Sequence, residues 1–329
     1  MTTKKIIMSG MRPTGQMHLG HLSVLENWAR LQKDYHCYYS IVDWHALTTS
    51  FDDTEEIREN IRQMAIDWLS VGIDPELSDI FVQSAVKEHA ELHLLFSMII
   101  PVSWLERVPT YKDQIRQFGS QGKDISTYGF LGYPLLQAAD VLVYRADTVP
   151  VGEDQVPHIE LTREVARRFN YMFRTDILPE PEALLAKIKM LPGTDNRKMS
   201  KSYNNYISLS SEPAQVLEKV QQMITDPARI RKNDPGHPDI CTVYTYHGFY
   251  NQEEKEEISA SCKAGTVGCF ACKRRLAERI DQRLAPILAK RAELENNPNL
   301  ITNILAQGEK NAAAAAAETL VLVREAMRI

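Results

Sequence analysis

Two short stretches carry residue types that could do phosphate chemistry. The first, Lys198-Met199-Ser200-Lys201-Ser202, places two lysines three residues apart within a polar, turn-forming run. This composition predicts a loop rather than the interior of a helix or strand. Two compact ammonium charges on a loop that closes over a polyphosphate could stabilise the charge that develops on leaving pyrophosphate. For a lysine pair taken alone, a solvated surface loop is the alternative.

The second stretch, His18-Leu19-Gly20-His21, is expected at the start of a helix that follows a strand and a turn. Imidazoles three residues apart share one helix face. At a helix N-terminus they can donate hydrogen bonds to phosphate oxygens, helped by free backbone N–H groups and by the helix dipole. Gly20 would let a base or a ribose approach the backbone closely. Taken alone, the two histidines are an ordinary cap and a surface residue, but together with the lysine loop they predict a nucleotide site.

These motifs need a scaffold, and the expected elements alternate along the first part of the chain. Strands are expected at 4–8, 37–42, 79–83 and 148–151, with helices from about 18 and at 53–71, 86–100, 134–144 and 154–169. Such alternation predicts a parallel sheet covered by helices. Past residue 206 helical patterns dominate. The predicted fold is therefore α/β: a Rossmann-like parallel-sheet nucleotide-binding domain over 1–205, with a helical insertion, followed by a helical domain over 206–329.

On its histidine and lysine motifs the chain resembles the class I aminoacyl-tRNA synthetases, whose paired motifs are called HIGH and KMSKS. Asp140 on an apolar helix, the run 149–155 and the run 158–163 narrow the resemblance to the tryptophanyl-tRNA synthetase family. Asp140 is either an exposed helix residue or a buried acceptor, and a buried carboxylate needs a donor. The indole N–H of tryptophan is a donor only, so such a carboxylate would select it. A tyrosine-specific synthetase is the nearest alternative, but no tyrosine–aspartate arrangement suited to a phenol hydroxyl is found.

The resemblance implies that the protein uses ATP to attach L-tryptophan to tRNA(Trp), through a tryptophanyl-adenylate and with Mg²⁺ on the ATP phosphates. It implies that Asp140 binds the indole nitrogen, that Gln155 holds the polar end of the amino acid, and that Met8 lies beside the ring. The implied catalytic residues are His18, His21, Lys198 and Lys201. The implied ATP-binding residues are Arg12, Pro13, Thr14, Gly20, His21, Lys112, Gly152, Glu153, Asp154, Leu191, Lys198, Met199, Ser200, Lys201 and Ser202.

Four of the five cysteines lie in one C-terminal segment, as Cys241-x20-Cys262-x6-Cys269-x2-Cys272. Structural zinc sites commonly use two C-x2-C pairs, and only one is present. A [4Fe-4S] cluster also takes four thiolates and tolerates irregular spacing. The spacing leaves the cluster, zinc and unliganded thiols open. The resemblance favours the cluster, because a subset of bacterial tryptophanyl-tRNA synthetases carries one with this C-x6-C-x2-C ending in the anticodon-binding domain.

Composition and charge limit the class of protein. The 44% hydrophobic and 25% charged content is that of an ordinary globular protein. The N-terminal apolar run is too short for a signal peptide and no stretch could span a membrane, so the cytoplasm is the expected location. A net charge of −5 argues against a protein that coats DNA non-specifically. Dimerisation into a homodimer is implied by the resemblance only.

Two further interpretations and one further motif complete the sequence prediction. A small nucleotidylyltransferase also uses an H-x-G-H turn, but the lysine motif and the helical C-terminal part count against it. A non-catalytic iron–sulfur tRNA-binding protein would not need both intact motifs. His89 and His93 fail the H-E-x-x-H zinc pattern, so they are expected on an ordinary helix face.

Overall fold

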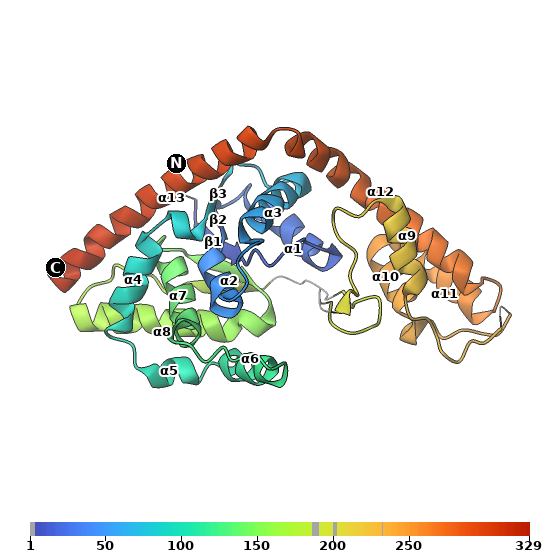
Figure 1. The fold of residues 1–329 in the computed structure, drawn as a ribbon, viewed down its shortest axis with the longest axis horizontal. Helices are drawn as coiled ribbons and strands as arrows, with labels where there is room; N and C mark the ends of the chain where they lie inside the picture. The colour runs from blue at the N-terminus through green and yellow to red at the C-terminus, as the bar shows by residue number, and fades with distance from the viewer. Residues whose placement is uncertain (1–3, 186–190, 200–202, 232) are drawn as a thin grey trace. The chain divides into compact units, whose positions relative to one another are not determined.

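The computed structural model describes residues 4–185, 191–199, 203–231 and 233–329. The chain divides into two compact units. The first unit contains Met1–Gly15, Asn27–Lys187 and Asn297–Ile329, and the second contains Gln16–Glu26 and Ile188–Asn296. Each unit is described by itself (Figure 1).

The first unit is built on a five-stranded parallel sheet in the order β3-β2-β1-β4-β5. The strands are β1 (Ile6–Met11), β2 (His36–Ile41), β3 (Ser78–Val82), β4 (Thr148–Val151) and β5 (Glu182–Leu185). β2 is buried along its length after its first residue, as expected of a strand covered on both faces. From the central β1 the chain moves first to β2 and β3, and later to β4 and β5. Ligands of such sheets bind where the order reverses, at the carboxyl ends of β1 and β4.

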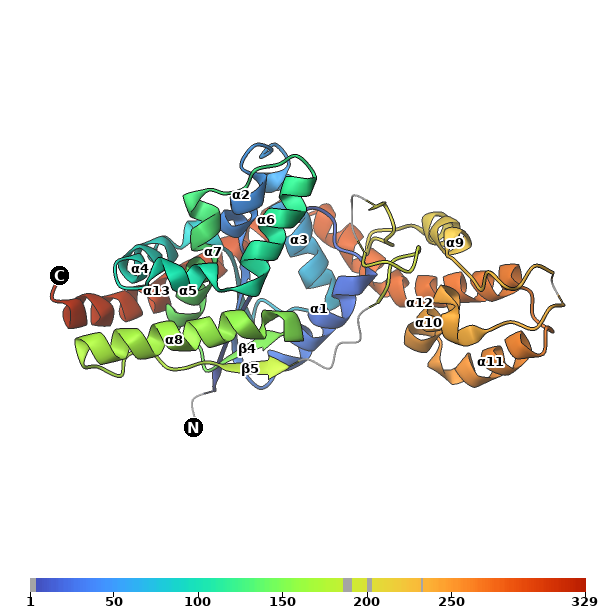
Figure 2. The same cartoon turned by 90° about the horizontal axis from the view of Figure 1, so that it is seen from below.

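Helices cover both faces of this sheet. The helices that lie wholly within the first unit are α2 (Asp43–Ser50), α3 (Ile57–Val71), α4 (Glu88–Ser97), α5 (Val102–Glu106), α6 (Pro109–Ser120), α7 (Tyr128–Leu142), α8 (Val156–Phe173) and α13 (Pro298–Met327). Side chains of α4, α7 and α8, such as Phe96, Leu142 and Phe169, form the main apolar core. Figure 2 shows α8 running beside β4 and β5. Helices α4 to α7 all lie between β3 and β4 in the sequence, where a helical insertion would lie.

The C-terminal helix α13 closes the open edge of the sheet along β3. A Cβ atom on Gly308 would collide with the backbone oxygen of Ile80, so this close approach of helix to strand requires glycine. Asn311 donates a hydrogen bond to Asp79 at 2.7 Å. A covered edge strand cannot pair with another chain, so α13 protects the sheet from edge-to-edge association.

The second unit is helical. It contains α9 (Pro213–Gln222), α10 (Thr242–Tyr250), α11 (Lys255–Lys263), α12 (Cys269–Glu295) and the first part of α1 (Leu19–Leu31). α9 and α10 both pack against α12. A capping box formed by Glu212 and Gln215 fixes the start of α9 by satisfying backbone N–H groups at that end.

The predicted fold class is confirmed: a parallel sheet with flanking helices, followed by a helical region. The strand expected at 148–151 is observed at those residues, and α2, α5, α6 and β5 were not predicted. The predicted domains, 1–205 and 206–329, differ from the contact-defined units, because α13 packs on the first unit and the second unit includes residues from 188 onward. In the described part of the chain, no helix is long and apolar enough to cross a membrane.

Candidate active site

Polar residues follow the carboxyl end of each of four neighbouring strands in the first unit. β1 is followed by Arg12, Pro13 and Thr14, β2 by Asp43 and His45, β3 by Gln83, and β4 by Gly152, Glu153, Asp154 and Gln155. Since the strands are parallel, these residues lie along one edge of the sheet. The turn after β1 uses Gly15 at φ +102°, a left-handed conformation that favours glycine. Gln155 donates a hydrogen bond to Asp154 at 2.9 Å.

Asp140 on α7 is a buried carboxylate that three side chains of the first unit contact. Its side chain is buried, with 3% of the residue exposed. His45 Nε2 lies 2.9 Å from Oδ2, His89 Nδ1 lies 2.6 Å from Oδ1, and Gln83 Nε2 lies 2.8 Å from both oxygens. Burial alone would raise the pKa of Asp140, but the two histidines outweigh it and the pKa is lowered. Asp140 is therefore an ionised acceptor.

The donors of Asp140 correct two sequence-based expectations. The chain itself supplies three donors to this carboxylate, so its burial does not by itself require a ligand donor. His89 is fully buried and bonded to Asp140, whereas an ordinary helix-face residue was expected. No role was predicted for His45 or Gln83. The one available signal was their place directly after buried strands, at the edge where α/β ligand sites gather.

Met8 and Lys112 complete the predicted residues of the first unit. Met8 is buried in the main core, on β1 opposite Tyr38 of β2. Lys112 is exposed on α6, the helix with no fully buried residue.

A second polar cluster holds the start of α6. The Thr110 hydroxyl lies 2.6 Å from the Tyr133 hydroxyl and 2.9 Å from His158 Nε2. His158 is buried, and this burial lowers its pKa to about 4. The charge of His45 lowers the pKa further, whereas the charge of Asp154 opposes the shift. His158 is therefore neutral at neutral pH. This cluster joins α6, α7 and α8 two residues before Lys112.

The histidine motif lies at the beginning of α1 in the second unit. The ring centroids of His18 and His21 are 3.9 Å apart, so the two imidazoles do share one face. His18 N–H donates to His21 Nδ1, and Gly20 N–H donates to His18 Nδ1, each at 3.2 Å. In a neutral ring whose Nδ1 accepts, the proton resides on Nε2. Each Nε2 is therefore a potential donor, while two of the backbone N–H groups expected to bind phosphate are used by the rings.

The described part of the lysine motif lies in a loop of the second unit. Asn205 Nδ2 donates to the carbonyl oxygen of Lys198 at 3.1 Å and to Asp195 at 2.7 Å. The Lys198 side chain is exposed. Met199 Sδ lies 3.2 Å from the position that a Cβ on Gly20 would take, so the two motifs touch. Ser200, Lys201 and Ser202 lie outside the described residues.

Leu191 lines a cavity of about 180 Å³ beside the first turns of α1. The other lining residues are Leu19, Leu22, Ser23, Glu26, Phe249, Tyr250 and Arg283. Of the predicted residues, the first unit thus holds Met8, Arg12, Pro13, Thr14, Lys112, Asp140, Gly152, Glu153, Asp154 and Gln155, and the second holds His18, Gly20, His21, Leu191, Lys198 and Met199.

The four C-terminal cysteines all lie in the second unit, near one another. Burial raises the pKa of Cys272 to about 12, and the other three cysteines add to this effect. Arg229 Nη1 lies 3.7 Å from Cys262 Sγ and 4.0 Å from Cys269 Sγ. Searching the described residues finds no group of three or more histidine, cysteine, aspartate or glutamate side chains arranged to hold a metal ion.

Comparison with known proteins identifies relatives over the whole chain. Residues 2–285 match the family described as tRNA synthetases class I (W and Y). The chain is 50% identical to a tryptophan–tRNA ligase of Thermotoga maritima, over 98% of this chain and 99% of that protein. It is 42% identical to a tryptophan–tRNA ligase of Aquifex aeolicus, again over 98% and 99%. Among solved structures, tryptophanyl-tRNA synthetase from Campylobacter jejuni, complexed with ADP and tryptophan, matches with a TM-score of 0.88 and 29% identity over 98% of this chain and 100% of that one.

Proposed function

The chain belongs to the class I tRNA synthetases for tryptophan and tyrosine, and we infer that it uses ATP to attach L-tryptophan to tRNA(Trp). The tryptophan carboxylate attacks the α-phosphorus of ATP in line, and the bond to pyrophosphate breaks. A ribose hydroxyl at the end of the tRNA then attacks the adenylate carbonyl, and AMP leaves. Mg²⁺ bound to the ATP phosphates neutralises part of their charge.

The buried, ionised Asp140 is the observation that carries the amino-acid assignment. It lies on the helix that packs beside β1 and accepts hydrogen bonds from three side chains of the first unit. An acceptor of this kind pairs with the indole N–H, which only donates. A site built for hydrogen bonding discriminates against a substrate that lacks the matching group, because the buried acceptor is then left without that partner. Gln155 would hold the polar end of the amino acid, and Met8 would lie beside the ring.

The residues of the two motifs would act on the phosphates. We propose that His18 and His21 donate from Nε2 and that Lys198 and Lys201 neutralise the leaving pyrophosphate, so that catalysis rests on positioning and charge. The remaining ATP contacts are proposed for Arg12, Pro13, Thr14, Gly20, Lys112, Gly152, Glu153, Asp154, Leu191, Met199, Ser200 and Ser202. Since tRNA is the second substrate, we propose that the enzyme works in the cytoplasm.

Exchange of labelled pyrophosphate into ATP tests the first step. The exchange should require tryptophan and should be lost without any amino acid. Tyrosine at the same concentration is the matched control, and exchange that runs equally well with tyrosine contradicts the assignment. Transfer of labelled tryptophan to tRNA(Trp) tests the second step.

We propose further that the four cysteines hold a [4Fe-4S] cluster. A four-thiolate set suits such a cluster, and N–H groups directed at the sulfurs, as from Arg229, are a common means of tuning one. Gly236 passes so close to Cys262 Sγ that a Cβ there would clash, so the backbone wraps tightly around this sulfur. Cys241, Cys262, Cys269 and Cys272 would be the ligands, and the cluster would fasten the second unit. Zinc on the same thiolates is the alternative.

Metal analysis of anaerobically purified protein distinguishes the [4Fe-4S] cluster from zinc. The cluster predicts brown protein with iron and acid-labile sulfide at about four of each per chain. Cys269→Ala should lose the colour, whereas Cys37→Ala should keep it because Cys37 is a buried residue of β2 in the first unit. A colourless protein with one zinc per chain contradicts the cluster.

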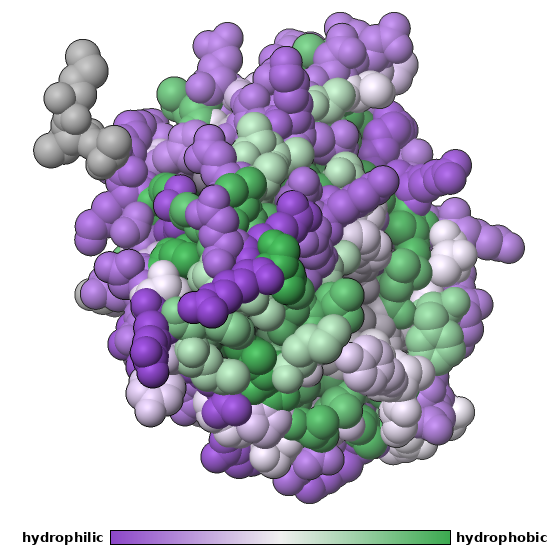
Figure 3. Space-filling model, turned by 90° about the vertical axis from the view of Figure 1, so that its left-hand side faces the viewer, coloured by the Kyte–Doolittle hydropathy of each residue, from purple (hydrophilic) through white to green (hydrophobic). Residues whose placement is uncertain are grey.

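We propose that the enzyme is a homodimer through an apolar surface at one end of the first unit. Leu94, Met98, Val102, Tyr171 and Met172 are exposed there, on α4, on α5 and at the end of α8. Arg168 of α8 donates to the carbonyl oxygen of Ile99, which joins these elements. Figure 3 shows apolar side chains gathered in one area with hydrophilic ones around it. Contiguous exposed apolar area on a folded chain indicates a protein interface.

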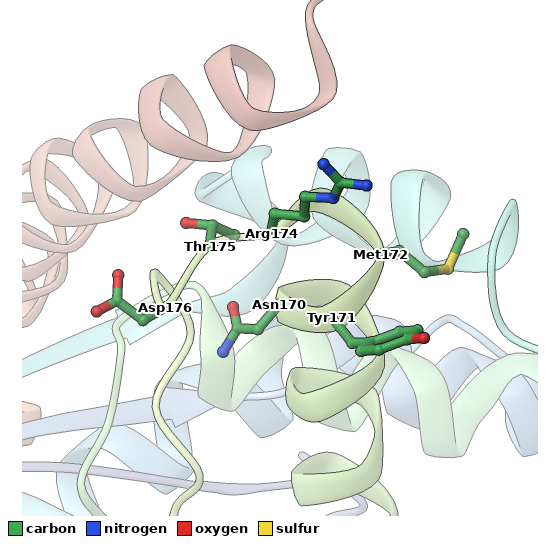
Figure 4. Close-up of a pocket in the computed structure, with 6 residues that line it drawn as sticks. All are labelled: Asn170, Tyr171, Met172, Arg174, Thr175 and Asp176. Atoms are coloured by element: carbon green, nitrogen blue, oxygen red, sulfur yellow. The ribbon is translucent and has the colours of Figure 1, made fainter.

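A hollow of about 600 Å³ lies beside this surface at the end of α8 (Figure 4). Its lining residues are Asn170, Tyr171, Met172, Arg174, Thr175 and Asp176. α8 is 18 residues long, so the hollow is roughly 27 Å from the strand end where α8 begins. It is therefore far from Gln155, which precedes α8 at its other end, and a second copy is its proposed occupant.

Light scattering on a sizing column measures the dimer. Met98→Glu should shift the protein toward monomer at low micromolar concentration. Ile230→Glu places the same charge on an even more exposed apolar residue, in the second unit, and should leave the mass unchanged. A monomeric wild-type protein contradicts the proposal.

A further inference from the structure

The carboxylate of Asp140 has nearly all of its acceptor positions filled by the protein. A carboxylate offers about four lone-pair positions. Among the described residues, Gln83, His45 and His89 donate three hydrogen bonds to it, with Gln83 shared between the two oxygens. Each of the two oxygens is therefore approached by two protein donors. The number of donors around Asp140 thus limits how many it can accept from a substrate.

The protonation of His89 follows from its two partners. Its Nδ1 lies 2.6 Å from Asp140, and its Nε2 lies 2.6 Å from the Tyr144 hydroxyl. Ionised Asp140 can only accept, so Nδ1 carries a proton. Burial raises the pKa of Tyr144 well above its ordinary value, so Tyr144 keeps its phenol proton and can donate it to Nε2. The geometry therefore describes a continuous hydrogen-bonded chain that runs from Tyr144 through His89 to Asp140.

Tyr144 is itself held in place by aromatic packing. Its ring stacks on Tyr38 of β2 with centroids 4.3 Å apart and an angle of 17° between the planes. The edge of Phe81 on β3 lies against it, at a centroid distance of 5.8 Å. Two strands of the sheet thus fix the ring, and the ring fixes the tautomer of His89.

We propose that Tyr144 and His89 are positioning residues for amino-acid selection. They hold the carboxylate of Asp140 at one orientation, in which it accepts a hydrogen bond from the N–H of the substrate ring. Neither is placed to touch the reacting atoms. This inference rests on the proposed function and deepens it, since it assigns the recognition of the indole N–H to a chain of three side chains rather than to Asp140 alone.

The test compares tryptophan with its benzothiophene analogue, 3-(benzothiophen-3-yl)alanine, in which sulfur replaces the indole N–H. The ratio of their dissociation constants isolates the hydrogen bond to Asp140 from the rest of binding. In the wild-type enzyme tryptophan should bind more tightly, by about ten- to hundredfold. In Tyr144→Phe this preference should fall severalfold, mainly through weaker tryptophan binding, while the affinity for the analogue stays nearly constant.

Tyr39→Phe is the matched control. It removes another buried hydroxyl of the same sheet, which donates to the carbonyl oxygen of Trp28 at 3.0 Å and has no part in the chain to Asp140. Its preference for tryptophan should equal that of the wild type, although its stability should fall by a similar amount. A fall in preference that is seen in Tyr144→Phe but not in Tyr39→Phe therefore cannot result from the loss of just any buried hydroxyl.

Two substitutions of His89 provide an independent measurement should Tyr144→Phe fail to fold. His89→Asn keeps a donor near the position of Nδ1, and His89→Leu removes it. The preference should rank wild type first, His89→Asn second and His89→Leu last. An unchanged ratio in Tyr144→Phe, or in both His89 variants, overturns the proposal. A wild-type enzyme that does not bind tryptophan would instead reject the proposed function, so the two failures are distinguishable.

Discussion

Asp140 of the first unit and Lys198 of the second hold their charges in opposite ways. In the first, Asp140 is buried and its oxygens are bonded to side chains that are themselves buried. In the second, Lys198 points a charge into solvent while Asn205 fixes only its backbone. An acceptor that must select one ring is best desolvated and oriented before the ligand arrives. A cation that must follow leaving pyrophosphate can stay hydrated until the phosphates bind.

This difference predicts how substitutions in each unit affect the protein. Changes around Asp140 should alter both the stability of the first unit and the choice of amino acid, because folding and recognition use the same hydrogen bonds. Changes in the lysine loop should alter turnover alone. The following experiments test that separation.

Removal of Asp140 should have the largest effect. Asp140→Ala leaves two histidines and Gln83 without their acceptor in a buried site. We expect the free energy of unfolding to fall by about 3–5 kcal/mol and tryptophan-dependent pyrophosphate exchange to be lost. Urea denaturation measures the free energy of unfolding, and the exchange assay measures the activity. Asp140→Asn, which retains one acceptor oxygen, should lose less stability. If Asp140→Ala unfolds at the wild-type urea concentration, the hydrogen bonds of the first unit do not support its fold.

Removal of the lysine charge should come next and should affect only the rate. Lys198→Ala is expected to lower kcat for exchange about 10²–10³-fold, because a charge that stabilises the transition state is lost. The free energy of unfolding should stay within about 0.5 kcal/mol, since the side chain is exposed. Arg197→Ala removes the neighbouring exposed cation and serves as control. An equal loss in both variants would mean that total loop charge, rather than the position of Lys198, matters.

Strands β1 to β4 were predictable from the sequence because each is a short apolar run followed by a helical pattern, whereas β5 was not predicted. α2 was missed because it begins at Asp43, directly after β2, with no turn-forming residue to mark its start. The donors of Asp140 were missed for a different reason. His45, Gln83 and His89 lie 95, 57 and 51 residues before it, so no local spacing connects them.

The C-terminal helix shows the same limit. Helical patterns were predicted past residue 206, where α13 lies, but helix propensity says nothing about which element a helix packs on. Its contact with β3 depends on Gly308 passing the backbone of Ile80, and only the folded chain brings these two residues together. Local structure follows from local pattern, while long-range pairing needs the topology.

Acid should weaken the first unit through His158. Burial lowers the pKa of His158 to about 4, below the value near 6.5 of an unfolded chain. Between these values the unfolded chain binds a proton that the folded chain does not, so stability should fall as pH decreases from about 6.5 to 4, by up to about 3 kcal/mol. Asp140 has a lowered pKa, so its contribution is present above the unfolded value near 3.9 and is lost only below that.

Stability measured by urea unfolding between pH 7 and pH 4 tests this. His158→Gln retains a hydrogen-bonding group for Thr110 but does not titrate. The stability of this variant should therefore depend less on pH over this range, although it should be lower at pH 7. If the free energy of unfolding changes with pH equally in both proteins, other groups dominate the acid response and His158 does not contribute to it.

The smallest effects on stability should come from exposed ion pairs. Their coupling energies test whether burial or surface charge explains the difference between Asp140 and Lys198. Arg324–Glu91 in the first unit and Arg283–Glu26 in the second are similarly exposed, with side chains 47% and 36% accessible in one pair and 47% and 39% in the other. Double-mutant cycles, with glutamine replacing each glutamate and methionine each arginine, should give coupling energies below about 1 kcal/mol in both units. Equal small values would mean that the units differ because Asp140 is buried and Lys198 is not. A coupling above about 2 kcal/mol in either pair would show that surface charge stabilises that unit, and the contrast would then have to be explained by charge placement rather than by burial.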